Sequence, residues 1–372
     1  MCQRDFDLDP SVLYLNHAAV SPWPRRTVEA VAAFARENGR FGSRHYDRWL
    51  ETEQALREQL VQLINAADSE EIALLKNTSE ALSVVAWGLD WQAGDRIVIS
   101  DQEFPSNRIV WESLKSLGVE VIAVNLCAAE TPEDALIGAI DERTRLLSVS
   151  SVQYATGLRL HLEILGKACR ERGVLFCVDA IQSLGAVPFD VQACQADFVA
   201  ADAHKWMLGP EGIALFYCRR GLINRLQLRQ FGWHMVEAMG DFDRRDWTPA
   251  GSARRFECGS PNMLGIHALH ASLGLILGLG LPAIYSNISR KISYLIELLK
   301  DNVSFISDVE TGRLAGILSF RPPDADIRAR YAHLQRAGVV CALRGGGIRF
   351  SPHYYTPDTV LERAVQILLE PL

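Results

Sequence analysis

A lysine and an aspartate, each beside an apolar run, are the residues of this sequence best placed to do chemistry. Lys205 lies in the stretch DFVAADAHKWMLGPEG (197–212), and Asp179 follows the apolar run 174–178. A lysine amine can form a Schiff base with an aldehyde cofactor, and a carboxylic acid can keep a pyridine nitrogen protonated so that the ring accepts electrons. Together the two residues predict a pyridoxal phosphate site.

Each residue also has a simpler interpretation, because a lysine after a strand is often a solvated loop residue and an aspartate often caps a helix. The combination favours the site, since His204 precedes the lysine and the turn Gly209-Pro210 leads into another apolar run. Asp179 would emerge at the carboxyl end of a buried parallel strand, where ligands of open α/β sheets bind. Gln182, three residues further on, is predicted to reach the phenolic oxygen of the cofactor ring.

The elements that must position these residues form a regular pattern. Between residues 71 and 217 short apolar runs alternate with helical patterns. This alternation predicts an α/β fold with a mostly parallel sheet covered by helices. The seven expected strands are 72–75, 96–100, 119–124, 146–149, 174–179, 198–200 and 213–217.

Several further motifs follow one another in the order typical of one enzyme family. They are YLNHAA (14–19), NTSE (77–80), EFPSN (103–107), FECGSPN (256–262) and IRFSPHYY (348–355). With the lysine and aspartate segments, they resemble the class V aminotransferase group of fold-type I pyridoxal phosphate enzymes, which includes cysteine desulfurases, kynureninases and isopenicillin N epimerase-like proteins. The resemblance covers nearly the whole chain. It implies a large cofactor-binding domain over residues 1–265 and a smaller C-terminal α+β domain over 266–372.

The NTSE segment follows one expected strand and precedes a helical run over 81–87. Free backbone amides at a helix start, aided by the helix dipole, bind anions. The same hydroxyls followed by Glu80 are equally explained as a helix cap. The resemblance implies that Thr78 and Ser79 bind the cofactor phosphate, and the two roles are compatible.

The EFPSN segment places Phe104 at the same edge of the sheet, where its ring can stack on the pyridine ring. An ordinary core phenylalanine is the alternative. Relatives often have histidine here, so the substitution excludes proton transfer by the stacking residue. Tyr154 stands where desulfurases carry an asparagine near cofactor and substrate. Asp202 replaces a phosphate-binding serine or threonine, and we expect it to orient His204 or hold a nearby arginine.

The resemblance also implies the residues that meet the substrate, an amino acid. Arg349 is expected to bind its carboxylate through two parallel hydrogen bonds, although an arginine in a strand is more often a surface charge. Asn16 and His17 resemble a substrate-side loop, and a buried, satisfied histidine is the alternative for His17. Ser260 matches a hydroxyl that reaches the phosphate of the other subunit, which predicts a homodimer with active sites at its interface.

The reaction type stays open at this point, and we expect an aminotransferase first. A C–S or β-lyase acting on cysteine or cystine comes next, followed by an amino-acid epimerase. A non-catalytic module that only keeps the fold is a remote alternative, because Lys205 and Asp179 are both retained. Desulfurases carry a nucleophilic cysteine on a loop shortly before the substrate arginine, whereas here LRGGG (343–347) leads directly to Arg349. We therefore expect no persulfide on an enzyme cysteine.

Composition narrows the remaining classes. The 372 residues are 48% apolar with a net charge of −7 and no basic stretch, which argues against a nucleic-acid partner. The eight cysteines form no Cys-x-x-Cys pair and no zinc-type spacing, so we expect reduced thiols and no metal. No glycine loop of a nucleotide-binding type follows the early strands. The start of the chain lacks the apolar core of a signal peptide, which predicts a cytoplasmic protein. We expect the apolar stretch 268–284 to be a buried or dimer-facing helix rather than a membrane span.

Overall fold

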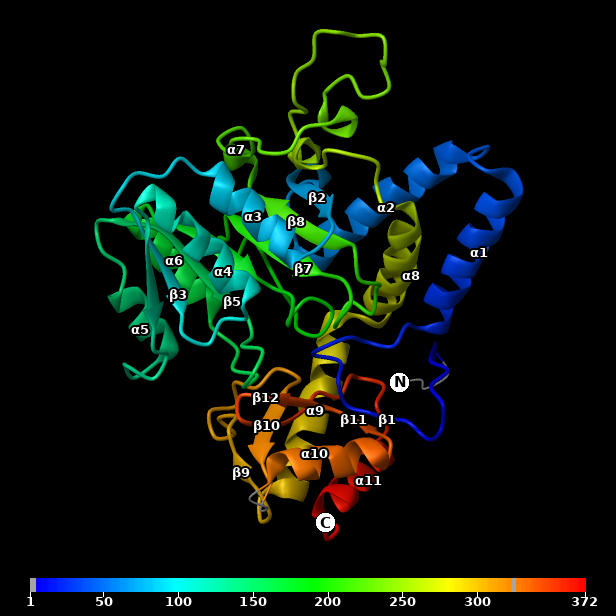
Figure 1. Cartoon of the computed structure of the whole chain (residues 1–372), viewed down its shortest axis with the longest axis vertical. Helices are drawn as coiled ribbons and strands as arrows, with labels where there is room; N and C mark the ends of the chain where they lie inside the picture. The colour runs from blue at the N-terminus through cyan, green and yellow to red at the C-terminus, as the bar shows by residue number, and fades with distance from the viewer. Residues whose placement is uncertain (1–4, 323–325) are drawn as a thin grey trace.

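The computed structural model describes residues 5–322 and 326–372 and is built around a seven-stranded sheet (Figure 1). Its strand order is β2-β8-β7-β6-β5-β3-β4. Only β8 runs antiparallel to its neighbours, so the predicted mostly parallel sheet is confirmed. The strand bounds are β2 Ile72–Leu75, β3 Arg96–Ser100, β4 Glu120–Val124, β5 Thr144–Ser150, β6 Leu175–Asp179, β7 Phe198–Asp202 and β8 Ala214–Cys218.

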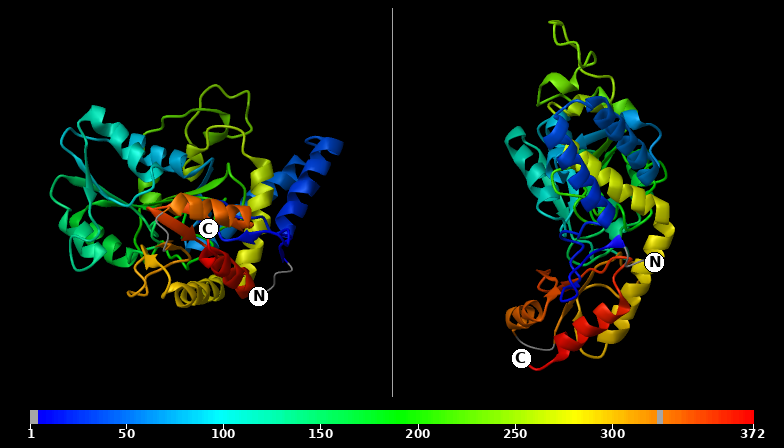
Figure 2. Two further views of the ribbon diagram at one scale, coloured as in Figure 1. Left: turned by 60° about the horizontal axis from the view of Figure 1, so that its bottom comes forward. Right: turned by 90° about the vertical axis from the view of Figure 1, so that its right-hand side faces the viewer.

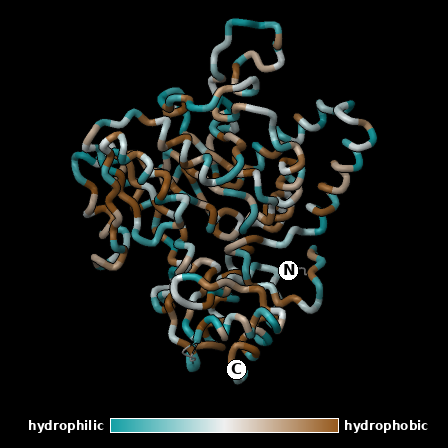
Figure 3. Tube along the Cα trace, in the orientation of Figure 1, coloured by the Kyte–Doolittle hydropathy of each residue, from teal (hydrophilic) through white to brown (hydrophobic). Residues whose placement is uncertain are grey.

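Helices cover both faces of this sheet, which explains why its central strands are mostly apolar and buried. The residues of β7 and β8 are all buried. One face packs against α3 (Thr78–Gly88) and α4 (Ser106–Glu112). The other packs against α2 (Tyr46–Ile64), α5 (Pro132–Gly138) and α6 (Leu162–Arg172). Figure 3 shows apolar residues concentrated in these strands, whereas the projecting loops are more polar.

The apolar stretch 268–284 does not form one helix, which corrects the sequence prediction. It belongs to α8 (Met263–Leu279) and α9 (Leu281–Leu299), which meet at an angle of 83°. Gly280 makes the bend with a φ of 81°, a backbone conformation that favours glycine. Helix α8 packs on α1 (Arg25–Phe41) and α2. Among the described residues no single helix is long and apolar enough to span a membrane, and only the bent pair reaches that length and composition together.

A second sheet lies beyond the bend, with the order β12-β13-β10-β9. Figure 2 shows α8 and α9 running from the large sheet towards it. The strands are β9 Ser304–Phe305, β10 Leu318–Arg321, β12 Ala342–Arg344 and β13 Gly347–Phe350, accompanied by α10 Ile327–Arg336 and α11 Asp358–Leu369. Near the amino terminus, β1 (Leu13–Tyr14) pairs with β11 (Val339–Val340) in the same region. A division of the chain at residue 265 stays a prediction, and β1 shows that the N-terminal segment contributes to the packing on both sides of it.

Strands β12 and β13 form a tight hairpin. Arg344 pairs with Gly347, and Ala342 pairs with Arg349. The two residues between the strands, Gly345 and Gly346, have φ values of 59° and 81°. Positive φ at both central positions is the type I′ geometry that matches the twist of antiparallel strands. Because paired residues share a face and side chains alternate along a strand, Arg344 and Arg349 lie on the same face of the hairpin.

A loop projects from the body between α7 (Arg220–Ile223) and α8, at the top of Figure 1. Its base is held by a buried ion network centred on Arg57, which donates to Glu53 at 2.6 Å and to both carboxylate oxygens of Glu257. Nδ1 of His234 lies 3.6 Å from Glu257. Potential metal-ligand atoms of Glu53, His234 and Glu257 lie within 4.8 Å of one another. The guanidinium already bonds to both carboxylates, and the expectation of no metal stays a prediction.

Candidate active site

A cavity of about 220 Å³ lies at the carboxyl ends of the central strands. Segments far apart in the sequence meet there because parallel strands end at the same edge of the sheet. Nine residues predicted from the sequence line it: Thr78, Ser79, Phe104, Tyr154, Asp179, Gln182, His204, Lys205 and Arg349.

Lys205 lies in the turn that follows β7 and is 7% exposed. The turn is fixed by hydrogen bonds from Leu208 N to Lys205 O and from Gly209 N to Ala203 O. Among the described residues no carboxylate lies within ion-pair distance of Lys205 Nζ, which stands 5.5 Å from the centre of the Phe104 ring. Burial lowers the pKa of the amine to about 8, although the charge of Asp179 opposes this shift. A buried amine with a lowered pKa is available as a nucleophile and base near neutral pH.

Asp179 is the last residue of β6 and is 2% exposed. Its Oδ1 accepts a hydrogen bond from Ile181 N at 3.0 Å. Burial raises the pKa of this carboxyl to about 7; the Ile181 N–H lowers it, and the nearby negative charge of Glu103 adds to the rise. A buried carboxylate with so little compensation favours a cationic partner. This is the environment that a protonated pyridine nitrogen would complete.

The amino terminus of α3 opens onto the same cavity. Asn77 is its N-cap and accepts from Glu80 N at 2.9 Å, so capping by Thr78 or Ser79 is wrong. Thr78 and Ser79 are instead the first two helical residues, whose backbone N–H groups have no partner within the helix. The hydroxyl of Thr78 accepts from Asp202 N at 3.0 Å, and that of Ser79 lies 2.9 Å from Ser106 Oγ. Backbone amides in this position at a helix start are suited to bind an anion.

Three side chains form the wall around Lys205. The rings of Phe104 and Tyr154 meet edge to face with their centres 5.1 Å apart. Gln182 donates to Ala18 O at 3.0 Å and accepts from the Trp206 indole at 2.8 Å. One N–H of its amide is left for a further acceptor. The predicted contact with a cofactor oxygen is therefore compatible with the bonds that hold this side chain.

Asp202 and His204 lie side by side, with Asp202 Oδ1 at 3.1 Å from His204 Nδ1. Both line the cavity. The backbone oxygen of His204 accepts from Ser21 N, which attaches the N-terminal segment to the lysine turn. His204 Nδ1 nevertheless has no hydrogen-bond partner, so the expectation that Asp202 orients the imidazole stays a prediction.

Arg349 is 1% exposed, so the alternative of a surface charge is wrong. One guanidinium nitrogen donates to Tyr154 O at 2.7 Å, and its Nε has no hydrogen-bond partner. Among the described residues no carboxylate lies within ion-pair distance of it. Burial, and then the charge of Arg344, lower the pKa of the guanidinium to about 10. A buried cation with an unused donor is suited to bind an anion.

Comparison with known proteins agrees with this geometry. The family model described as Aminotransferase class-V matches residues 13–353. This chain belongs to the class V aminotransferases. A probable cysteine desulfurase of Methanothermobacter thermautotrophicus is 32% identical, over 99% of this chain and 96% of its own.

Several solved structures have the same fold as this class V aminotransferase. The apo structure of a cysteine desulfurase from Thermococcus onnurineus NA1 has a TM-score of 0.87 at 25% identity and covers 98% of this chain and 96% of its own. Two structures of C-DES have 23% identity. One is a variant with glycine covalently linked to the PLP cofactor, with a TM-score of 0.89 and 96% of each chain covered. The other is the cystine C–S lyase with its product cysteine persulfide, with a TM-score of 0.88, covering 96% of this chain and 97% of its own.

The chain is therefore a pyridoxal phosphate-dependent enzyme of fold type I, and its own residues fit that cofactor. Lys205 supplies a buried amine, Asp179 a buried carboxyl without a cationic bond to any described residue, and the start of α3 free amides for a phosphate. The individual roles of these residues stay predictions.

Three residues predicted from the sequence do not line the cavity. His17 is buried, with its ring nitrogens 2.8 Å from Ser351 O and 2.7 Å from the Tyr355 hydroxyl, as expected of a satisfied core histidine. Asn16 forms an isolated bridge with Ser351. Ser260 borders a separate surface pocket near Leu74 and Gly212. Its predicted role depends on a second subunit and stays a prediction.

Six lining residues were not predicted: Ala18, Ala19, Asn77, Ser106, Ile181 and Arg344. Ala18 and Ala19 directly follow Asn16 and His17, which were predicted. The sequence therefore indicated the right segment, but different side chains of it line the cavity. The sequence around Arg344 contains a pattern from which its position could have been predicted. A Gly-Gly turn with two antiparallel strands places it on the face of Arg349.

Proposed function

We propose that this enzyme cleaves a C–S bond of a sulfur-containing amino acid by β-elimination. The aminotransferase expected first from the sequence gives way to the alternative of a C–S lyase, since a relative that matches 99% of the chain is a probable cysteine desulfurase. One observation carries the proposal. The cavity joins Lys205, Asp179 and Arg349 but contains no thiol among the described cysteines.

The position of Cys341 supports release of the sulfur product rather than its transfer to the enzyme. Cys341 lies between β11 and β12, 3% exposed, and burial raises the pKa of its thiol to about 12. A buried thiol with a raised pKa is a poor nucleophile. A mechanism that ends with the sulfur on the leaving fragment needs no such thiol.

The residues divide the work as follows. The Arg349 guanidinium binds the substrate α-carboxylate. Lys205 Nζ, neutral above its lowered pKa, takes the proton from the α-carbon. Asp179 holds the positive charge at the pyridine nitrogen. Pyridoxal phosphate, when bound, supplies an electron-accepting ring.

The products follow from the balance of the reaction. The Cβ–S bond breaks and the sulfur leaves with the bonding electrons. The remaining three-carbon fragment hydrolyses to pyruvate and ammonia. With cystine the sulfur product is cysteine persulfide, and with cysteine it is hydrogen sulfide. No external reductant or oxidant is needed.

The experiment is a product analysis of the holoenzyme with cysteine and with cystine. We expect pyruvate and ammonia in equal amounts, together with a sulfane or sulfide product. Formation of alanine and enzyme-bound sulfur would point to desulfurase chemistry instead. Amino transfer to an added keto acid without pyruvate release would restore the aminotransferase. The homodimer and the cytoplasmic location stay predictions.

A further inference from the structure

Arg344 is a second cation in the active-site cavity, at its mouth. It is exposed, whereas Arg349 on the same hairpin face is 1% exposed. The type I′ turn fixes the separation of the two positions, because Arg344 pairs with Gly347 and Arg349 pairs with Ala342. The tip of the hairpin is also held against the body, since a Cβ at Gly345 would lie 3.4 Å from Ala155 Cβ. A bound molecule would therefore meet two guanidiniums at different depths.

Neither guanidinium has an acidic partner in the part of the chain that the structure describes. Arg344 donates to Leu343 O at 2.8 Å, and Arg349 donates to Tyr154 O. Within the described ranges, 5–322 and 326–372, no carboxylate lies within ion-pair distance of either one. The charge of Arg344 further lowers the pKa of Arg349 and of Lys205. Like charges brought together without a counter-ion are unfavourable, and a ligand carrying two anionic groups would relieve that repulsion.

The cofactor does not use both cations in the proposed arrangement. Its phosphate is predicted at the start of α3, where Thr78 and Ser79 offer backbone amides and hydroxyls. The substrate α-carboxylate is assigned to Arg349. Arg344 is then the cation in the cavity without an assigned anion, and its exposure places it towards the far end of an elongated substrate.

We propose that Arg344 binds a second, distal anionic group of the substrate. The substrate class is an amino acid whose β-sulfur carries a substituent that ends in a carboxylate, as in an amino-acid disulfide. This inference rests on the proposed C–S lyase and makes it more specific. Arg344 is a specificity-determining residue, because it contacts the part of the substrate that leaves with the sulfur.

The test compares matched disulfides with the holoenzyme. Cystine and the mixed disulfide of cysteine with 3-mercaptopropionate both carry a distal carboxylate, whereas the mixed disulfide of cysteine with cysteamine does not. A hydrogen bond to a charged group contributes about 1.5–3 kcal/mol, so we expect wild-type kcat/KM to be on the order of 10- to 100-fold higher for the two carboxylates. In Arg344→Gln that preference should disappear, and Arg344→Lys should restore part of it.

Arg321→Gln is the matched control. Arg321 donates to Gly346 O of the same turn but does not line the cavity, so its loss should leave the preference unchanged. An equal preference in wild type and Arg344→Gln would overturn the proposal. Weaker cofactor binding in Arg344→Gln, with the preference intact, would also overturn it and assign Arg344 to the cofactor.

A binding experiment separates this proposal from the proposed reaction. Calorimetry with adipate, a dicarboxylate, and hexanoate, a monocarboxylate of the same length, needs no turnover. We expect adipate to bind wild type on the order of 10-fold more tightly, and both to bind Arg344→Gln alike. If none of the disulfides is cleaved but adipate still binds more tightly than hexanoate, the proposed lyase activity is wrong and the proposed role of Arg344 is kept. Equal binding of the two acids to wild type would overturn the role of Arg344.

Discussion

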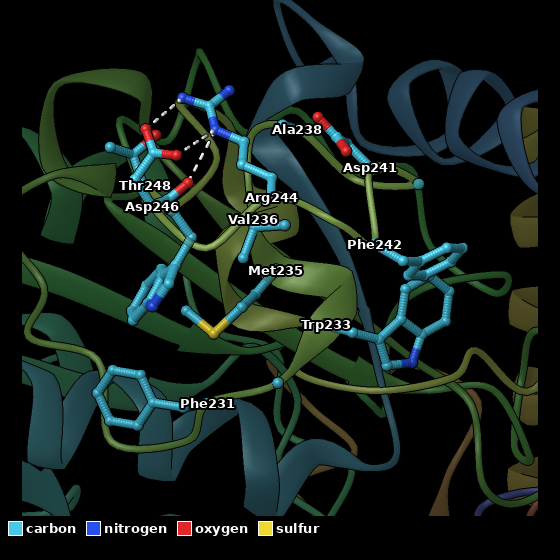
Figure 4. A pocket seen from close by; sticks show the side chains of 13 residues that line it. Phe231, Trp233, Met235, Val236, Ala238, Asp241, Phe242, Arg244, Asp246 and Thr248 are labelled. Carbon is cyan, nitrogen blue, oxygen red and sulfur yellow. Dashed lines mark hydrogen bonds and ion pairs between the residues drawn. The ribbon is translucent and has the colours of Figure 1, made fainter.

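Two pockets of this enzyme differ in volume, and the smaller one holds the residues that are suited to chemistry. The pocket in the projecting loop has a volume of about 440 Å³, twice that of the Lys205 cavity at about 220 Å³. Figure 4 shows the loop pocket with Phe231, Trp233, Met235 and Phe242 around it, and Trp247 also lines it. Of its three charged residues, Arg244 and Asp246 bind each other at 3.1 Å, and Asp241 is exposed to solvent. The smaller cavity instead holds Lys205 and Arg349 buried without carboxylate partners in the described part of the chain.

The difference shows that unpaired buried charge locates the chemistry better than volume does. An exposed ion pair such as Arg244–Asp246 is screened by water and leaves little free charge for a ligand. A buried cation without a counter-ion keeps the unfavourable energy of desolvation until an anion arrives. Stability alone would not retain such groups, whereas ligand binding gives them a partner.

The largest effect that separates the pockets should come from Lys205→Ala. Proton transfer by a positioned side chain contributes about 10²- to 10⁴-fold, and loss of the amine also removes its bond to the cofactor. We expect turnover to fall at least about 10³-fold. Borohydride reduction followed by mass spectrometry should attach the cofactor to wild type and not to the variant. Phe242→Ala, at a ring 77% exposed in the loop, is the control and should keep wild-type turnover.

Arg349→Gln should produce the next largest effect. Loss of a charged hydrogen-bonding partner for the α-carboxylate should raise KM by about 10- to 100-fold, with a smaller change in kcat. Steady-state kinetics with the cleaved substrate measure this split. Arg244→Gln removes the same charge from the loop pocket and should change neither constant. An unchanged KM in Arg349→Gln would remove this arginine from the site.

The pH dependence of cofactor attachment tests the electrostatics of the Lys205 cavity. Only the neutral amine reacts with the aldehyde, and the pKa of Lys205 is lowered to about 8. The attachment rate of apoenzyme should therefore rise about tenfold per pH unit below 8 and level off above it. Asp179→Asn removes a charge that raises this pKa, so the midpoint should move to lower pH. A midpoint near that of free lysine would contradict the burial of the amine.

The smallest effect on activity should come from the loop pocket. Phe231, Phe242 and Trp247 are 63%, 77% and 52% exposed. Exchanging all three for serine should change the free energy of unfolding little, because surface substitutions are usually within about 0.5 kcal/mol each. Turnover should stay at the wild-type level, because none of the three rings lines the Lys205 cavity. Steady-state kinetics measure this, and a large fall in turnover would show that the loop acts on that cavity.

The sequence predicted the sheet well because its strands are buried on both faces. The bounds of β2 and β3 are the predicted ones, and β4 begins one residue later than expected. The gathering of Lys205 and Asp179 followed from a general rule, since both stand at carboxyl ends of neighbouring strands. Hydropathy alone did not reveal the break at Gly280, because the apolar run continues through it.

The less predictable residues depend on contacts between distant segments. His17 is apart from the cavity because Ser351 and Tyr355, more than 330 positions away, take both ring nitrogens. No local pattern reports such bonds. Arg349 was expected from a family motif, but its burial and its bond to Tyr154 O come from the packing of β13 against the segment after β5.

The two-glycine turn between β12 and β13 has a consequence for how this enzyme can change. Its strands hold Arg349 by pairing it with Ala342, three positions back from the turn. Arg344 is an exposed residue next to the turn, so exchanging its side chain would leave this pairing intact. Evolution or an engineer can therefore exchange the group presented at the cavity mouth while the carboxylate anchor below it keeps its register. In the proposed arrangement, one short hairpin thus carries two separate functions. Arg349 binds the carboxylate that every amino acid has, and Arg344 selects among amino acids.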